Sequence, residues 1–274
     1  MVSIEQIKER AQAERVSVHL VLKEHVHLLV LDYLFKQGAF PHLVFQGGTA
    51  LRLAYRGVRY WEDLDFVLGK RSSSFFGRVP TILKGLPSFL DKAIPLSQRV
   101  EVKAQKQTPT FQRFNLILET ESLGARDRTS IEVANVPSYE NQAVFIHSES
   151  ASTAPAVCVE TPREILSDKL CAFGSREYVK GRDIWDIHFL MKTLNQPIDD
   201  PVERMARRKA ADYRLSRRDF MQRFRDHLAI LEDRGSAILR DEMHRFLPAA
   251  HQDLFKGQYG VMEAVVLKAL KEFY

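Results

Sequence analysis

The chain has 274 residues, of which 45% are hydrophobic and 27% are charged. A chain of this length can bury a sizeable core in one large domain or two smaller ones, and this composition excludes a disordered or fibrous protein. The formal net charge of +5 suits an anionic partner, although the placement of the basic residues is more informative than their total.

The first half of the chain alternates between helical and β-like patterns. Residues 3–13 predict a polar helix and residues 18–37 a more apolar one. Strands are predicted at 43–45, before a glycine turn and a helix start, and at 64–68, while 70–97 is expected to form helix with loops. Further β-like runs follow at 99–104, 111–119, 129–133, 143–147 and 157–159.

The second half is helical almost to its end. Thr161 and Glu164 form a capping box with Pro162 at the first helical position, and Ser216 with Asp219 is a variant of the same signal. We therefore predict an α+β protein, with a mixed-sheet α/β domain over 1–155 and an all-helical domain over 156–274.

No targeting or membrane segment is expected. Residues 1–10 lack the apolar core of a signal peptide, and no apolar run approaches the ~18 residues of a membrane span. Cys158 and Cys171 match no zinc-site spacing, and we interpret them as small buried side chains in a reducing compartment. These features predict a cytoplasmic protein.

Gly47 and Gly48 stand at the predicted strand-to-helix turn. Backbone N–H groups at such a turn can bind a phosphate, although two glycines before a helix are more often only turn geometry. Asp63 and Asp65 are two residues apart on a predicted strand, so their carboxylates share one face. Two buried carboxylates repel unless a cation lies between them, and Mg²⁺ prefers such oxygen ligands; the alternative is a solvated strand end.

Glu132 is the candidate third carboxylate. A third acid would complete a two-metal site of the kind that clamps attacking and leaving oxygens. Glu132 stands between Ile131 and Val133 in a β-like run, where an edge or surface position would explain it equally well.

These motifs together resemble a known family. Gly47-Gly48-Thr49-Ala50-Leu51, followed by Arg59-Tyr60-Trp61-Glu62-Asp63-Leu64-Asp65-Phe66, is similar to the first motif of AbiEii-type toxins, whose mycobacterial relatives are called MenT. These toxins are a branch of the DNA polymerase β-like nucleotidyltransferases. The resemblance implies a mixed-sheet nucleotidyltransferase core, a following helical domain, and transfer of nucleotides from NTP to RNA, commonly the tRNA 3′ end. Trp61 departs from the pattern, because the family often has a serine there that is phosphorylated in some relatives.

The resemblance continues into the second half. Residues 164–170, with Lys169, and 182–187, with Arg182, Asp183 and Asp186, are similar to the family's later motifs. Lys169 stands near the buried margin of its helix, where it needs an anion such as a triphosphate; the alternative is a surface lysine. A local Arg182–Asp186 ion pair would explain these two residues without a function. The family pattern implies that one aspartate orients Lys169 or the acceptor, and we favour Asp186.

A basic cluster follows these motifs. Residues 204–225 contain nine Lys or Arg against two acidic residues, a density typical of a surface that binds a phosphate backbone, although a solvated helical face would also explain it. The candidate RNA-binding residues are Arg207, Arg208, Arg214, Arg217 and Arg218.

The sequence thus predicts a metal-dependent nucleotidyltransferase toxin of a toxin–antitoxin or phage-defence system. Gly47, Gly48, Thr49, Lys169, Arg182 and Asp183 are expected to bind the NTP. Asp63, Asp65 and Glu132 are expected to bind Mg²⁺ or Mn²⁺ and, with Lys169 and Asp186, to catalyse transfer. The expected partners are RNA, in particular tRNA, and a cognate antitoxin, but no membrane. The alternatives are transfer to a protein or small molecule, and an inert module that binds RNA or protein.

Overall fold

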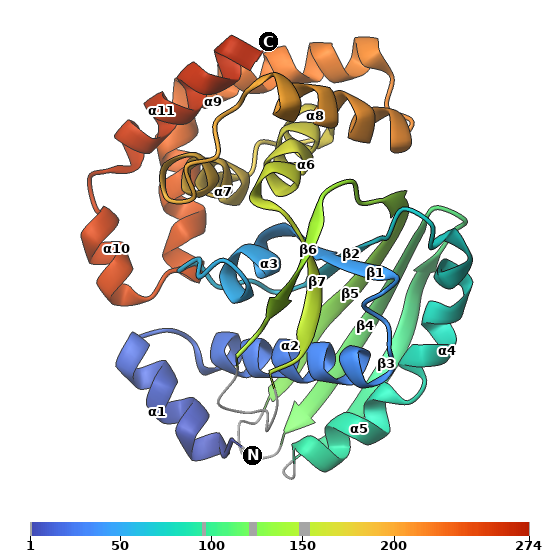
Figure 1. Cartoon of the computed structure of the whole chain (residues 1–274). Helices are drawn as coiled ribbons and strands as arrows, with labels where there is room; N and C mark the ends of the chain where they lie inside the picture. Colours follow the sequence, from blue (N-terminus) through green and yellow to red (C-terminus); the bar gives the residue numbers. More distant parts are fainter. Residues whose placement is uncertain (1, 95–96, 121–124, 148–153, 274) are drawn as a thin grey trace. The chain divides into compact units, whose positions relative to one another are not determined.

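A computed structural model of the chain describes residues 2–94, 97–120, 125–147 and 154–273. It divides into two compact units (Figure 1). The α/β unit comprises residues 1–56 and 60–160. The helical unit comprises residues 161–274 together with the short segment Gly57–Arg59.

A mixed sheet forms the centre of the α/β unit. Its strand order is β3-β4-β5-β2-β1-β7-β6. The pairs β2–β5 and β1–β7 are parallel, and the other neighbouring pairs are antiparallel. The bounds of the strands are β1 Leu43–Gln46, β2 Leu64–Leu68, β3 Ser97–Gln107, β4 Phe111–Thr120, β5 Ala125–Pro137, β6 Asn141–Phe145 and β7 Ala156–Glu160.

Helices pack on this sheet and bury its centre. The side chain of Ser3 begins the first helix through a capping box with Gln6. The long second helix is buried along most of its length and contacts β5 and β7 (Figure 1). In the core, Phe45 and Phe66 pair across β1 and β2 with ring centroids 5.3 Å apart. The elements are α1 Ile4–Glu14, α2 Val18–Lys36, α3 Gly47–Leu53, the 3₁₀ helix η1 Ser73–Arg78, α4 Val79–Leu83 and α5 Leu86–Ala93.

The helical unit begins where its capping signals predict. Thr161 caps the helix that starts at Pro162, and Ser216 caps the longest helix through the N–H of Asp219. Gly181 lies against that long helix so closely that an added Cβ would be 2.6 Å from the Ile238 carbonyl oxygen. The elements are α6 Pro162–Ser175, α7 Gly181–Lys192, α8 Asp200–Asp212, α9 Arg217–Phe246, α10 Ala249–Phe255 and α11 Tyr259–Phe273.

The predicted fold class is confirmed: a mixed sheet with helices is followed by an all-helical part. One detail of the prediction is wrong. Cys171 is buried, but Cys158 is only half-buried, because it stands on β7 beside the sheet's edge strand β6, where its thiol donates to the Asn141 side chain. None of the described helices is both long and apolar enough to cross a membrane.

Candidate functional site

The Gly47–Gly48 turn lies between β1 and α3 and is closely packed. Gly47 has a φ of +76°, which L-residues rarely adopt, and a Cβ there would lie 2.9 Å from Asp65 Oδ2. A Cβ on Gly48 would lie 1.5 Å from the Trp61 ring. Both glycines are therefore required by the geometry of the turn, which places backbone directly against the Asp65 carboxylate and the Trp61 indole.

Asp65 and Glu132 are neighbours on the sheet. Asp65 on β2 pairs in register with Glu132 on the parallel strand β5, and with Gln46 on β1 at its other side. Residues paired in register lie on the same face of a sheet, about 4.8 Å apart along the hydrogen-bonding direction. Both acidic residues are half-buried. The fold thus brings together two acids that are distant in the sequence, beside the Gly47 turn.

Asp63 is placed differently from its prediction. It precedes β2 rather than lying on it, and its Oδ1 accepts a hydrogen bond of 3.1 Å from the Ser130 N–H on β5. Its backbone carbonyl accepts a hydrogen bond from the Thr49 hydroxyl. These two hydrogen bonds therefore orient the Asp63 carboxylate toward the backbone of β5.

Thr49 was predicted to bind phosphate, but its side chain holds the protein backbone. The residue is 1% exposed, and its hydroxyl donates to the Asp63 carbonyl. Within the described part of the α/β unit, the Thr49 side chain therefore positions Asp63.

Two residues that the sequence did not single out complete this support. The Thr129 hydroxyl donates to the Glu62 carbonyl, and His27 Nε2 lies 2.8 Å from Thr129 Oγ1 and 3.3 Å from the Glu62 oxygen. Burial lowers the pKa of His27 to about 4, so the imidazole is neutral at pH 7 and its Nε2–H tautomer satisfies both contacts. The backbone immediately before Asp63 is thus fixed by side chains from α2 and β5.

The three predicted metal ligands are not gathered tightly. Among the described residues, Asp63, Asp65 and Glu132 do not form a group whose ligand atoms all lie within 4.8 Å of one another. Asp63 is turned toward Ser130, and Glu132 forms an ion pair of 2.7 Å with Arg113 on β4. The chemistry of the donor set still fits a hard cation, since all the ligand atoms are carboxylate oxygens. The part of the set with the best geometry is the adjacent pair Asp65 and Glu132.

The helical unit contains a buried ion network around Lys169. Lys169 is 6% exposed, and its Nζ lies 3.0 Å from Asp183 Oδ1 and 2.6 Å from Asp186 Oδ2. The interpretation as a surface lysine is therefore wrong, because α6 turns this side chain into the unit. Arg59 adds a second cation to Asp186 at 3.0 Å, and Arg176 adds one to Asp183 at 3.1 Å. Lys169, Arg59 and Arg176 thus all pair with these two carboxylates.

Two members of this network, Asp183 and Arg59, are ionised at neutral pH. Burial opposes the charge on Asp183, but Lys169 and Arg176 outweigh it and hold the pKa of that carboxyl below its usual value. Burial lowers the pKa of Arg59 to about 10, with Asp186 opposing the shift, so the guanidinium keeps its charge. Arg182, the remaining predicted residue here, is half-buried, and its backbone N–H donates to Glu242 Oε2 at 3.1 Å.

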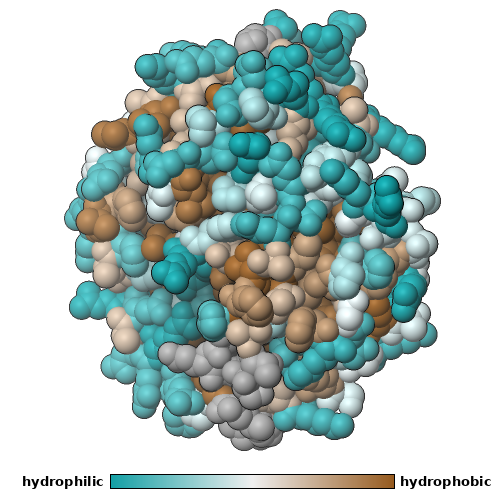
Figure 2. Space-filling view, viewed as in Figure 1, coloured by the Kyte–Doolittle hydropathy of each residue, from teal (hydrophilic) through white to brown (hydrophobic). Residues whose placement is uncertain are grey.

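The five predicted RNA-binding arginines are all exposed. They lie on α8, at the α8–α9 connection and on the first turn of α9: Arg207, Arg208, Arg214, Arg217 and Arg218. On the face shown in Figure 2, the surface over these elements is mainly hydrophilic. Lys209 does not belong to this surface, because it is fully buried and pairs with Glu164 at 2.6 Å and Asp168 at 3.0 Å.

Comparisons with known proteins agree with the fold described above. The family described as nucleotidyl transferase AbiEii toxin, type IV TA system, matches residues 29–264, a range that includes every candidate residue above. JHP933 from Helicobacter pylori is similar in structure, with 20% identity over 94% of this chain and 95% of that chain and a TM-score of 0.53. A candidate nucleotidyltransferase from H. pylori has 20% identity over 94% of this chain and 99% of that chain, with a TM-score of 0.54. No curated protein matches the sequence significantly.

Proposed function

The chain belongs to the AbiEii nucleotidyltransferase toxin family, and from this premise we propose that it transfers nucleotides from an NTP to an RNA acceptor, the 3′ end of tRNA. Family membership makes it a nucleotidyltransferase of a toxin–antitoxin system and implies a cognate antitoxin. The observation that carries the proposal is the in-register pairing of Asp65 with Glu132 beside the Gly47 turn. Because NTP and tRNA are found in the cytoplasm, we place the activity there.

Asp65 and Glu132, with Asp63, are proposed to hold Mg²⁺ or Mn²⁺. The metal, when bound, supplies neutralising charge to the triphosphate. The backbone at Gly47 and Gly48 holds the phosphates beside it. The acceptor hydroxyl oxygen bonds to the α-phosphorus, pyrophosphate leaves, and Glu132 accepts the hydroxyl proton. Metal binding competes with Arg113 for Glu132, which gives the ion pair at 2.7 Å a direct influence on metal affinity.

The buried network of the helical unit is proposed to favour the triphosphate. Lys169, Arg59 and Arg176 all pair with the carboxylates of Asp183 and Asp186, so the network holds cations that can attract a triphosphate. The Arg176 side chain is 37% exposed and can contact a ligand, and the half-buried Arg182 also lies near Asp183. Lys169 and Asp186 then act by orienting the charged side chains of this network. The exposed arginines of α8 and α9 support RNA as the acceptor.

Transfer of labelled nucleotide tests the proposal. Each of the four NTPs, labelled at the α-phosphate, is incubated with the protein and with tRNA, protein or metabolite pools. We expect label in tRNA, and a loss of at least about a hundred-fold in Asp65→Asn and Glu132→Gln, because each change removes an ionic ligand. Chelation of divalent ions should have the same effect, reversed by Mg²⁺ or Mn²⁺.

Glu119→Gln is the matched control for Glu132→Gln. Glu119 also pairs with an arginine of a neighbouring strand, Arg126, at 3.4 Å, but lies away from Asp65. Full transfer by Asp65→Asn would exclude the assigned carboxylates. Label in protein or metabolites in place of tRNA would exclude the RNA acceptor, and no turnover of any NTP would favour an inert binding module. Growth arrest by the wild type but not by Asp65→Asn would link transfer to toxicity.

A further inference from the structure

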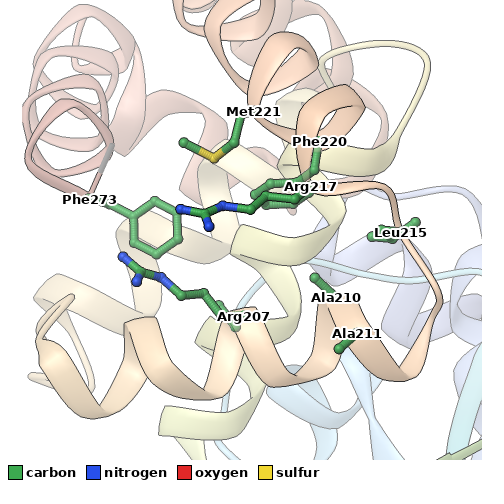
Figure 3. Close-up of a pocket in the computed structure, with 9 residues that line it drawn as sticks. Arg207, Ala210, Ala211, Leu215, Arg217, Phe220, Met221 and Phe273 are labelled. Atoms are coloured by element: carbon green, nitrogen blue, oxygen red, sulfur yellow. The ribbon is translucent and has the colours of Figure 1, made fainter.

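A pocket of about 350 Å³ lies within the helical unit between α8, the start of α9 and the end of α11 (Figure 3). Its size falls at the lower end of the range of about 300–1,000 Å³ for small-ligand sites. It therefore suits one nucleotide-sized group rather than a length of polymer. No residue assigned above to metal, NTP or the buried ion network lines it.

The apolar wall of the pocket is held in place from behind. The Phe220 ring packs against Gly174 of α6 so closely that a Cβ there would lie 2.3 Å from it. The Phe273 ring is 5.3 Å from the buried Phe224 ring. Leu215 and Met221 complete the apolar surface. Two aromatic rings are thus fixed before any ligand arrives, which lowers the entropic cost of binding a flat apolar group.

The polar part of the pocket is cationic. Figure 3 shows the guanidinium groups of Arg207 and Arg217 extending toward Phe273. Arg207 forms an exposed ion pair of 3.3 Å with Glu203, which water and salt screen. Arg217 makes no ion pair with any described residue. The ligand should therefore carry negative charge next to its apolar part.

The positive charge continues beyond the pocket onto the surrounding surface. Arg214 and Arg218 are exposed on either side of Arg217 in sequence and, within the described ranges, form no ion pairs. The nearby acids are Glu203, which pairs with Arg207, the exposed Asp219 in the first turn of α9, and the half-buried Asp212. Positive charge outweighs negative charge on this surface. A chain with repeated negative charges would bind along it, with one residue inside the pocket.

We propose that this pocket binds one unstacked nucleotide of the RNA acceptor. The base enters against Phe220, and Arg207 and Arg217 bind its phosphates, while Arg214 and Arg218 contact the neighbouring phosphates. Single-stranded RNA is typically recognised by bases that stack on aromatic rings or guanidinium planes beside a cationic groove. The inference rests on the proposed function in taking RNA as the ligand, and it adds a site for the RNA that is separate from the acidic pair.

Binding of single-stranded RNA tests the site without catalysis. The full chain carrying Asp65→Asn is titrated into a fluorescent 12-nucleotide RNA, and affinity is read by anisotropy. Ala211→Trp fills the pocket from an exposed position, so the fold is retained. This change should weaken binding by roughly 5- to 150-fold, the range expected for losing one stacked base. Arg217→Gln removes a phosphate contact, so it should also weaken binding and should make binding less sensitive to salt.

RNAs with a single abasic position distinguish the pocket from general charge. In the Asp65→Asn background one such RNA should bind more weakly than the others, and Ala211→Trp should abolish that difference. Arg218→Gln is the control outside the pocket and should lower affinity for all RNAs alike. It should also reduce the slope of log affinity against log salt concentration by about one. Unchanged affinity in Ala211→Trp, or equal binding of all abasic RNAs, would overturn the proposal. These results do not depend on transfer activity, so a failure here is distinct from a failure of the proposed function.

Discussion

Replacing Lys169 by methionine should strongly destabilise the helical unit. Lys169 is 6% exposed and its partners Asp183 and Asp186 are 1% and 2% exposed, so water cannot replace the lost cation. Breaking a buried ion pair by removing one partner typically costs about 3–5 kcal/mol. Each aspartate keeps one cation, Arg176 or Arg59, so we expect the lower end of that range, about 3 kcal/mol.

Urea unfolding of the full chain, followed through a signal that comes only from the helical unit, checks this magnitude. Trp185 on α7 is buried against Phe255, with ring centroids 4.9 Å apart, and reports on this unit. Trp61 belongs to the α/β unit, so the measurement is made in a Trp61→Phe background. A signal from one unit is needed because a chain with two units need not unfold in one step. Lys192→Met, at an exposed position on α7, is the control and should change stability by less than about 0.5 kcal/mol.

A double-mutant cycle with Asp183→Asn separates the ion pair from the loss of methylene packing. We expect a coupling free energy of at least about 1 kcal/mol. The effect should also depend on pH. Because the folded pKa of Asp183 is depressed, its contribution to stability is present above its ordinary pKa of 3.8 and is lost as the pH falls below that value. A loss of stability below about 1 kcal/mol for Lys169→Met at pH 7, or a loss that stays the same in acid, would refute this explanation.

Two further predictions concern the α/β unit, and urea unfolding measures both. The folded pKa of His27 is about 4 against 6.5 for the free side chain, so the unfolded chain gains the proton first as the pH falls from 6.5 to 4. Stability should decline over this window by up to about 1.4 kcal/mol per pH unit from this residue, and His27→Gln should reduce the slope; an unchanged slope would exclude His27 as its source. Gly48→Ala should cost about 1–3 kcal/mol by displacing Trp61, and Trp61→Ala should restore part of it; additive losses would contradict this explanation.

Strand positions could be predicted from the sequence wherever an apolar run ended sharply. The predicted strand 64–68 matches β2, because buried apolar residues there are followed by Gly69. The run at 99–104 was too short, since β3 spans Ser97–Gln107. Its additional residues are polar, and Ser97, Lys106 and Gln107 among them pair with residues of β4. Backbone pairing of this kind leaves no apolar pattern to detect.

Long-range neighbours in the candidate site could not be predicted in the same way. Asp65 and Glu132 meet only because β2 and β5 are parallel neighbours, and no local pattern determines strand order. The i,i+3 spacing did indicate that Asp183 and Asp186 share a helix face. Their partner Arg59 is more than a hundred residues away in the sequence, so its role depended on the fold of the helical unit.

The position of Arg59 in the sequence changes how substitutions in the ion network should be interpreted. Arg59 belongs to the helical unit through Asp186, yet only three residues separate it from Asp63. A change at Asp186 that releases Arg59 can therefore shift the chain that leads into the Asp63–Asp65 segment, although His27 and Thr129 still hold the Glu62 carbonyl. Loss of transfer after such a change is compatible with a positioning role alone, because a displacement of about 1 Å can lower a rate a hundred-fold. The assignment of Asp65 and Glu132 does not have this ambiguity, since both lie within the sheet.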